Sequence, residues 1–443
     1  MPDNCPITRN TAVIPGLPGV VIPEIILPAE ELSLYHWAVI ACDQFTAQAD
    51  YWQETEKQVG QAPSTLRLVL PELYLEHPSG LSISDRIQTI NQTMARYWHD
   101  GLLRRLPPGC MLLDRRTAVH GSRKGLVLAV DLDCYDFTPG NHELIRATEG
   151  TVLERIPPRV AIRRDALFEL PHIQVLIDDS GHRVIEPLLS ALQKEQPRPF
   201  YETELMQDGG SLRAWFAPAG SPLLQEAFQA MAGLGSLKNH GLLMAVGDGN
   251  HSLATAKAHW QNMRAVYGPD HPARYALVEV INLHDQGLAF EPIHRTITNL
   301  SPGQFLEQAR RFFKDQDFQV LPTDGAPDTA SCSTASAHRI PMLTAQGRCG
   351  LYIGNPRQPL AAGAIQDFLD DLVLATPARI DYIHGDDVVA RLAAEGQIGL
   401  LLPAMKKQEL FPSLIRDGVL PRKTFSLGEA REKRYYMECR QIR

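Results

Sequence analysis

The sequence predicts a mixed α/β (α+β) fold. Short apolar runs of strand length, such as Leu242–Val246 and Ile173–Ile177, occur in the same chain as Ser82–Leu103, where apolar residues recur every three or four positions. The first pattern is typical of buried strands and the second of an amphipathic helix. Strand-like and helix-like segments do not alternate regularly, which argues against a doubly wound parallel sheet.

The same patterns predict the elements of the first half of the chain. Val13–Leu27 alternates Gly and Pro with β-branched residues and is expected to be extended. Trp37–Cys42 is predicted to be a short buried strand, and Gly125–Leu132 another. After Leu242–Val246, apolar residues mark one face of a helix, namely Leu253, Ala256, Trp260 and Met263.

The second half is expected to contain a strand pair and a smaller mixed unit. Tyr275–Leu283 and Leu288–Ile297 are predicted to be paired strands joined through His284–Gly287. Thr323–Ala337 is rich in Ala, Ser, Thr and Asp without periodicity and is expected to be a loop. Beyond it we expect two helices and a strand, at Ala364–Leu374, Asp386–Glu395 and Ile398–Leu402.

Composition defines the class of protein. The 443 residues are 44% hydrophobic and 21% charged, which is ordinary for globular domains and excludes disordered or collagen-like chains. No uninterrupted apolar run is long enough to cross a membrane, and the N-terminus lacks the basic start and apolar run of a signal peptide. The seven cysteines are scattered without a Cys-x-x-Cys pair, so reduced thiols and a cytoplasmic protein are expected.

The predicted organisation has four parts: an N-terminal α+β region, 1–135; a central region carrying the site described below, 136–322; a linker or loop, 323–338; and a C-terminal α+β region with a basic tail, 339–443. The sequence does not indicate an oligomeric state.

Charge is distributed unevenly. The net charge is −8, yet the last 40 residues contain ten Lys/Arg and five Asp/Glu, a local +5 that leaves −13 for the rest. An acidic body disfavours nucleic acid as a partner, because phosphate-backbone binding needs a basic footprint. The tail is expected to be mostly solvated surface that could serve a small anionic ligand or a partner.

The best candidate site is the segment Gly247–Ser252, Gly-Asp-Gly-Asn-His-Ser, between a predicted strand and a predicted helix. The glycines Gly247 and Gly249 permit unusual backbone angles and a close approach of a ligand. The N–H groups and positive dipole end of the following helix form an anion site. Since a helix follows, a hairpin turn does not explain the Asp-Gly pair.

Each polar side chain of this segment has a predicted role. Asn250 or Ser252 could cap the helix, and Ser252 could donate to a phosphate oxygen. Asp248 could hold Mg²⁺, which prefers carboxylates, water and phosphate. His251 could donate to a transferring phosphoryl group or move a proton. The alternative is a structural turn, because Asp-Gly is a common turn pair.

Basic residues elsewhere are secondary candidates for phosphate binding. Arg155 and Arg159 could clamp phosphates or pair with Glu149 or Glu154; Pro157–Pro158 favours an extended loop there. Three more candidates are His294 and Arg295, whose side chains should point to opposite faces of a strand, and Lys423 of the basic tail.

The segment Gly247–Ser252 resembles the Asp-Gly-His-His-Arg signature of the bacterial and archaeal family of domain of unknown function 1015. Phe290–Arg295 resembles the Pro-x-His-Arg strand of that family. Leu402-Pro403 and Pro421–Thr424 resemble its C-terminal Met-Pro-x-Lys-Ser/Thr region. The pieces extend from about Trp37 to the end of the chain.

The resemblance implies a ParB/sulfiredoxin-like nucleotide-binding core with additional α+β elements, and a relationship to the free serine kinase. It therefore implies ATP or ADP with Mg²⁺ as ligands and a small-molecule phosphate acceptor, an amino acid such as serine being the first candidate. Only Asp248, Gly249 and His251 match the signature. Asn250 replaces its first His and Ser252 its Arg, which removes a cation unless another basic residue substitutes.

Three functions are compatible with these residues. The first is a small-molecule phosphotransferase in which a carboxylate, with Glu24 and Glu30 as candidates, accepts the proton of the acceptor hydroxyl. The second is a nucleotide-binding switch or scaffold without turnover. The third is a metal-dependent hydrolase or oxygenase that would use Asp248, His251 and His294.

Overall fold

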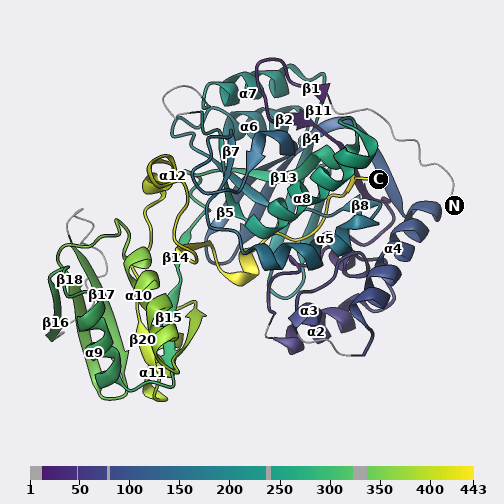
Figure 1. Ribbon diagram of the computed structural model, residues 1–443. Coiled ribbons are helices and arrows are strands. Elements are labelled where there is room, and N and C mark those ends of the chain that lie inside the picture. Colours follow the sequence, from purple (N-terminus) through teal and green to yellow (C-terminus); the bar gives the residue numbers. More distant parts are fainter. Residues whose placement is uncertain (1–11, 47, 77–79, 236–240, 323–336) are drawn as a thin grey trace. The chain divides into compact units, whose positions relative to one another are not determined.

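The computed structural model describes residues 12–46, 48–76, 80–235, 241–322 and 337–443. They form two compact units (Figure 1): unit 1 comprises the described residues of Met1–Ala289 together with Ala430–Arg443, and unit 2 is Phe290–Glu429. The four-part division expected from the sequence stays a prediction, and most of its linker, 323–336, lies outside the described residues.

Unit 1 is built on a 12-stranded mixed sheet. Its main path runs β10 (Tyr201–Leu205), β11 (Gly210–Pro218), β4 (Leu103–Thr117), β5 (Gly121–Asp131), β13 (Tyr275–Asn282), β9 (Gln174–Ile177), β12 (Met244–Asp248), β7 (Ile145–Ala147) and β6 (Tyr135–Asp136). Three short strands pair beside this path, β1 (Ala12–Val13), β2 (Val20–Ile22) and β3 (Glu24–Pro28). Neighbours are mostly antiparallel, but three pairs are parallel, namely β12 with β7, β7 with β6, and β13 with β9.

Helices cover both faces of this sheet because its central strands are apolar on both sides. One core contains residues of α6 (Ile185–Glu195), α7 (Pro222–Ala232) and α8 (Asn250–Tyr267). The other contains residues of α1 (Leu34–Trp37), α2 (Ala49–Val59), α3 (Leu73–Glu76) and α4 (Ile83–His99). Alternate residues of β5 belong to opposite cores, Leu126 and Leu128 to the first and Val127 to the second.

The end of the chain crosses the second face of the sheet. Within Ala430–Arg443, five charged residues are buried, namely Glu432, Lys433, Arg434, Glu438 and Arg440. They are paired: Arg434 bonds Glu279 at 2.7 Å and Glu438 at 2.6 Å, and Arg440 bonds Glu169 at 2.6 Å. The expectation of a solvated tail is therefore wrong for these residues, because acidic partners compensate the charge of the arginines, namely Glu279 in β13, Glu169 in β8 (Phe168–Glu169) and Glu438 in the tail itself.

Unit 2 is a smaller mixed α/β structure. Its six-stranded sheet has the order β16 (Phe318–Pro322), β18 (Gly347–Ile353), β17 (His338–Thr344), β20 (Ile398–Leu400), β15 (His294–Thr298) and β19 (Arg379–Ile383). A separate pair joins β14 (Phe290–Pro292) to β21 (Phe425–Leu427). The helices are α9 (Pro302–Phe312), α10 (Ala361–Ala375), α11 (Asp386–Ala394) and α12 (Leu410–Asp417).

Two predicted strand elements are wrong. Residues 37–41 are buried and Cys42 is half-buried, but Trp37 ends the short helix α1 and Ile40 makes only an isolated bridge to Tyr435. The run's apolar character reports burial rather than strand geometry. Residues 275–297 do not form a hairpin either: β13 pairs with β5 and β9 in unit 1, whereas β15 pairs with β19 and β20 in unit 2.

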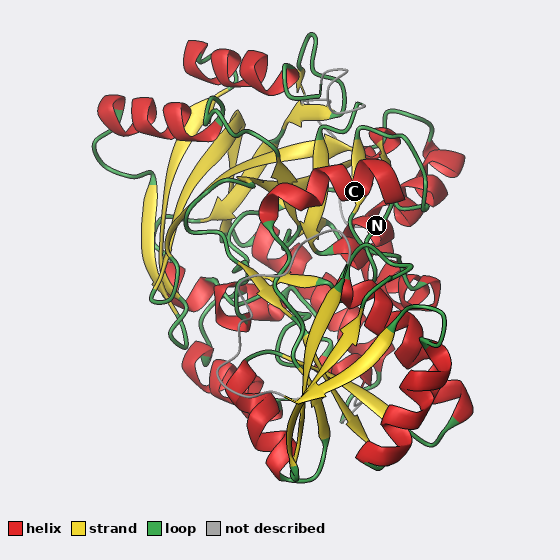
Figure 2. Cartoon of the chain, turned by 90° about the vertical axis from the view of Figure 1, so that its left-hand side faces the viewer, coloured by secondary structure: helices red, strands yellow, loops and turns green. Residues whose placement is uncertain are grey.

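The predicted fold class is confirmed: both units mix helices with strands, as Figure 2 shows. The predicted helices at 82–103, 364–374 and 386–395 correspond to α4, α10 and α11. In the described part of the chain, no helix has the length and apolar character needed to cross a membrane.

Candidate functional site

The segment Gly247–Ser252 joins β12 directly to α8, as the sequence predicts. Gly249 is the N-cap residue of α8 with a φ of 79°. A Cβ at this position would lie 3.1 Å from Ile173 Cα, so both backbone angle and packing favour glycine. Asp248 Oδ1 accepts the Gly249 N–H at 3.1 Å, which closes the turn.

No side chain caps this end of α8. The predicted capping by Asn250 or Ser252 is wrong, because both side chains bond elsewhere. Leu253 N–H donates to Gly249 O at 3.0 Å, which is the first turn of an 18-residue helix. The helix therefore presents its N-terminal amide end and the positive end of its dipole to the turn.

A cation from the end of the chain lies at this turn. Lys433 Nζ is 3.2 Å from Asp248 Oδ2, and the two side chains are 7% and 20% exposed. The ammonium group supplies positive charge to a segment that has Ser252 where the signature it resembles has arginine. The sequence indicates Lys423 of the basic tail, and not Lys433, as a candidate for phosphate binding.

Asn250 and His251 tie the start of α8 to the neighbouring backbone. Asn250 Oδ1 accepts the Thr148 N–H, and its amide donates to Thr148 Oγ1, both at 3.1 Å. His251 Nε2 accepts the Val152 N–H at 3.2 Å. In the neutral ring the proton is therefore on Nδ1, and the donor role predicted for His251 falls to that nitrogen.

Ser252 ends a hydrogen-bonded chain with a defined direction. The Tyr436 phenol oxygen accepts the Cys42 N–H at 3.0 Å, so its own proton is directed to His172 Nδ1 at 2.9 Å. The neutral His172 ring then carries its proton on Nε2 and donates to Ser252 Oγ at 2.7 Å. Ser252 consequently directs its own hydroxyl proton away from His172 and can donate it to an anion.

Asp43 adds a second carboxylate to this region. Its Oδ2 lies 3.7 Å from His172 Nε2. Burial would raise the pKa of Asp43, but the charge of His172 when its ring is protonated, the Gln44 hydrogen bond and Lys433 outweigh burial and hold the pKa below its ordinary value. Asp43 is therefore ionised at neutral pH.

A cavity of about 150 Å³ lies beside the start of α8. Its polar lining includes Ser252, His172, Glu72 and Arg159. The apolar lining comes from the second core of the sheet and includes Leu68, Leu70, Ile90, Met94, Phe168 and Leu277. A volume near 150 Å³ accommodates about one aromatic ring, so the cavity suits a small molecule or part of one.

The two predicted arginines differ in position. Arg159 lines the cavity, and its Nε donates to Glu72 Oε1 at 2.9 Å. Arg155 precedes it at the helix start and accepts a bond from Arg159 through its carbonyl oxygen. The loop expected here is wrong: Ile156–Arg164 forms α5, with both prolines in the first turn, where their missing N–H groups are tolerated.

His294, Arg295 and Lys423 belong to unit 2. His294 Nε2 bonds Asp386 Oδ1 at 2.7 Å, and its Nδ1 accepts the Leu402 N–H at 3.0 Å. Arg295 is buried and donates to Ile293 O at 2.6 Å and to Lys423 O at 3.1 Å. Their part in ligand binding stays a prediction, as it does for the residues of unit 1.

Among the residues that the structure describes, no group of three or more His, Cys, Asp or Glu side chains is arranged to hold a metal ion. Asp248, the predicted Mg²⁺ ligand, has both carboxylate oxygens engaged, one by the Gly249 N–H and one by Lys433. The geometry therefore supplies groups for an anion and does not supply a ligand set for a cation.

Several residues of this cluster were not identified from the sequence, namely Lys433, His172, Asp43, Tyr436 and Glu72. Lys433 had a weak signal, as part of the basic tail. His172 directly precedes the predicted strand at 173–177, which turns out to pair with β12. The others gave no local signal, because their neighbours in space are distant in sequence.

The chain is distantly similar to several solved structures. No curated protein matches the sequence. Among solved structures, a free serine kinase in complex with AMP is similar, with 9% identity, a TM-score of 0.38, and coverage of 72% of this chain and 91% of that one. SbnI from Staphylococcus aureus is 10% identical with a TM-score of 0.36, and the match covers 68% of this chain and 82% of SbnI. A conserved hypothetical protein from Pyrococcus furiosus is 10% identical with a TM-score of 0.35, and the match covers 70% of this chain and 90% of that one.

The family match covers residues 24–372. It includes Gly247–Ser252 and Phe290–Arg295, whereas Leu402-Pro403 and Pro421–Thr424 lie beyond it. Because the match spans most of the chain, it confirms the resemblance seen in the signature. The chain belongs to the family described as "Protein of unknown function (DUF1015)".

Proposed function

We propose that this protein is a nucleotide-dependent phosphotransferase that acts on a small molecule. One observation carries the proposal: the uncapped amide end of α8 and the Lys433 ammonium group meet at Asp248, beside a cavity that begins at Ser252. Helix N-termini and ammonium groups bind phosphate. Phosphoryl transfer depends mainly on positioning and on stabilisation of charge, which such groups provide.

The roles follow from the hydrogen bonds. The first-turn amides of α8 and Lys433 would bind the phosphate groups, with Ser252 donating a further hydrogen bond. The cavity would hold the acceptor or the nucleoside. The signature's resemblance to nucleotide-binding relatives makes ATP and ADP the first nucleotides to test, and serine the first acceptor. We expect such an enzyme to work in the cytoplasm.

We propose Glu72 as the base that accepts the proton of the acceptor's hydroxyl group. Glu72 lines the cavity and pairs with one arginine, Arg159. Glu169 also lines it, but two arginines, Arg440 and Arg163, outweigh burial and keep the pKa of Glu169 below its ordinary value. Glu24 and Glu30, the candidates predicted from the sequence, pair with Arg105 and Arg104 and do not line the cavity. A carboxylate that lines the cavity is the better candidate for contact with an acceptor hydroxyl.

Mg²⁺ would enter with the nucleotide rather than be held in advance. Both oxygens of Asp248 already have partners, so Asp248 does not fit a resident metal ion. Mg²⁺ normally keeps several waters and binds through phosphate oxygens and one or two carboxylates.

A second function is nucleotide binding without turnover. It is favoured because two side chains of the signature segment, Asn250 and His251, are bonded to other groups of the protein. Asn250 is bonded to Thr148, and His251 Nε2 is occupied by a backbone N–H. If these bonds persist with ligand bound, the first-turn amides of α8 and Lys433 would hold a nucleotide without activating an acceptor.

The deciding experiment combines binding with transfer. Calorimetry measures ATP and ADP affinity with and without Mg²⁺, and phosphorus NMR follows transfer from ATP to serine and other hydroxyl compounds. Binding with transfer supports the phosphotransferase, and tight binding without transfer supports the second function. Absence of nucleotide binding contradicts both.

A matched pair of variants tests the cavity. Arg159→Gln removes a charge that lines it, whereas Arg155→Gln removes a charge one helical turn away that does not. We expect Arg159→Gln to weaken binding or transfer about tenfold, as expected for loss of a charge-assisted bond, and Arg155→Gln to leave both unchanged. Equal effects would show that the cavity has no special part in either.

A further inference from the structure

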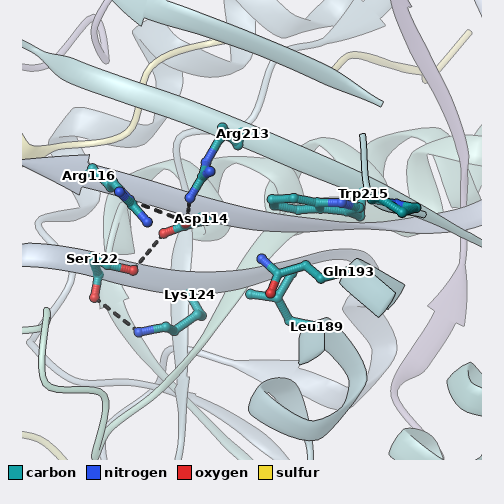
Figure 3. Close-up of a pocket in the computed structure, with 9 residues that line it drawn as sticks. Asp114, Arg116, Ser122, Lys124, Leu189, Gln193, Arg213 and Trp215 are labelled. Carbon is teal, nitrogen blue, oxygen red and sulfur yellow. Dashed lines mark hydrogen bonds and ion pairs between the residues drawn. The ribbon is translucent and has the colours of Figure 1, made fainter. Parts of the chain in front are cut away.

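A second cavity in unit 1, of about 430 Å³, lies between the sheet and the end of α6 (Figure 3). Its lining combines three strands with one helix: Asp114 and Arg116 from β4, Ser122 and Lys124 from β5, Arg213 and Trp215 from β11, and Leu189, Gln193 and Pro197 from α6 and the residues after it. None of these residues belongs to the signature segment or lines the cavity beside it.

The strand register places the charged residues together. Asp114 is directly opposite Arg213 on one side and Lys124 on the other, and Arg116 is opposite Ser122. Since side chains two positions apart share a face of a sheet, all five point to the same side. Trp215, two residues after Arg213 on β11, points to the same side. It is opposite Leu112 of β4, and both belong to the first core.

Asp114 organises the charged end. Ser122 Oγ donates to its Oδ1 at 2.6 Å, Arg213 Nη2 donates to its Oδ2 at 2.5 Å, and Arg116 Nε lies 3.5 Å from Oδ2. Although burial opposes it, the bonds from Ser122 and Arg213 hold the pKa of Asp114 below its ordinary value. The carboxylate is therefore ionised and fixes the guanidinium groups in place.

Positive charge remains after this pairing. Three cations, Arg116, Lys124 and Arg213, line the cavity together with a single carboxylate. Asp285 lies outside the lining, 4.0 Å from Lys124 Nζ. Glu202 of β10, directly opposite Arg213 on the same face, also lies outside the lining. Among the residues that line the cavity, the cations therefore exceed the carboxylate by two. The charged end therefore favours an anion over a cation or a neutral group.

The other end is apolar and rigid. Trp215 is buried, and its Nε1 donates to Gln196 O at 3.0 Å, which fixes the orientation of the indole. The Arg213 guanidinium lies 5.7 Å from the centre of this ring, so the charged and aromatic parts of the lining adjoin. Figure 3 shows Trp215 and Leu189 on the side of the cavity away from Arg116.

We propose that this cavity binds a small organic anion, with its carboxylate or phosphate oxygens at Arg116, Lys124 and Arg213 and a flat apolar body beside Trp215 and Leu189. Arginine presents several donors that match such oxygens in pairs, which explains why two arginines converge here. The volume is within the range of small-molecule sites. The proposal is independent of the function proposed for the start of α8.

The test is calorimetric titration of the 443-residue chain with phenyl phosphate and, in parallel, with inorganic phosphate and with phenol. We expect phenyl phosphate to bind more tightly than either fragment, because it occupies both ends. Arg213→Gln and Lys124→Gln should each weaken it about tenfold, the usual effect of losing a charge-assisted bond. Arg213→Lys should retain part of the affinity, which shows that the site still folds.

Two control variants distinguish binding in this cavity from a general effect of charge and from binding at α8. Arg348→Gln removes an exposed charge of β18 and should change nothing. Lys433→Gln alters the start of α8 and should leave phenyl phosphate binding intact. The proposal is overturned if wild type does not bind phenyl phosphate at millimolar concentration, or if inorganic phosphate binds equally well. It is also overturned if Lys433→Gln, and not Arg213→Gln, abolishes binding, which would place the anion at α8.

Discussion

Lys433 and Asp248, 185 positions apart in the chain, form an ion pair in which Lys433 Nζ lies 3.2 Å from Asp248 Oδ2. The pair attaches the buried end of the chain to the turn before α8. It also places an ammonium group where a bound phosphate would meet the amides of the helix. One contact thus joins the fold of unit 1 to its candidate site.

Lys433→Met should weaken ADP binding about tenfold or more, because a hydrogen bond between charged groups contributes about 1.5–3 kcal/mol. Calorimetry measures the change, and Lys433→Arg, which keeps the charge, should lose less. Unfolding in urea should show a lower stability for Lys433→Met as well, since Asp248 is left without its partner. An unchanged ADP affinity would remove Lys433 from the proposed site.

Gly249→Ala should destabilise the protein through both backbone angle and packing. A left-handed conformation costs an alanine about 1–2 kcal/mol, and the new Cβ would lie 3.1 Å from Ile173 Cα. Gly101→Ala is the control, because Gly101 has a φ of 70° with nothing within 4 Å of a Cβ. Urea unfolding should show the larger loss for Gly249→Ala; equal losses would mean that the contact with Ile173 is unimportant.

Tyr436→Phe should change the proton position on His172. The phenol now directs its proton to Nδ1, so nitrogen NMR of the wild type should show the neutral ring protonated on Nε2. The variant loses that donor, and the Cys42 N–H loses its acceptor, at a cost of about 1–3 kcal/mol. Tyr435→Phe removes the bond to Met206 O instead and should leave His172 unchanged. A wild-type ring protonated on Nδ1 would contradict the hydrogen-bonded chain.

His259 should make stability depend on pH. Burial, with help from Arg163 and His271, lowers the pKa of this residue of α8 to about 4, from about 6.5. Between these values the unfolded chain binds a proton that the folded chain does not, so stability should rise with pH from about 4 to about 6.5. His259→Gln should reduce this slope in urea unfolding, and His99→Gln, at an exposed position, should not. An unchanged slope in His259→Gln would show that another group controls it.

Local sequence patterns predicted the strand–turn–helix from β12 to α8 well. The apolar run before Gly247 and the helical spacing of Leu253, Ala256 and Trp260 both report burial against the same core, and glycine at 249 reflects a left-handed angle. The pattern failed at Trp37–Cys42, because burial there comes from packing rather than from a sheet. It also failed at 275–297, where two apolar runs next to each other in sequence belong to sheets of different units.

The sequence by itself determined the mixed fold class, the family and the turn at Gly247–Ser252, because each depends on residues close together in the chain. The tertiary structure alone decided which charges meet there. Lys433 reaches Asp248, and Tyr436 reaches His172, only because the chain returns to unit 1 after residue 429 and buries its last residues across the sheet. Composition presents that tail as solvated charge; acidic partners from distant strands make its burial possible, and spacing along the chain does not encode such partners.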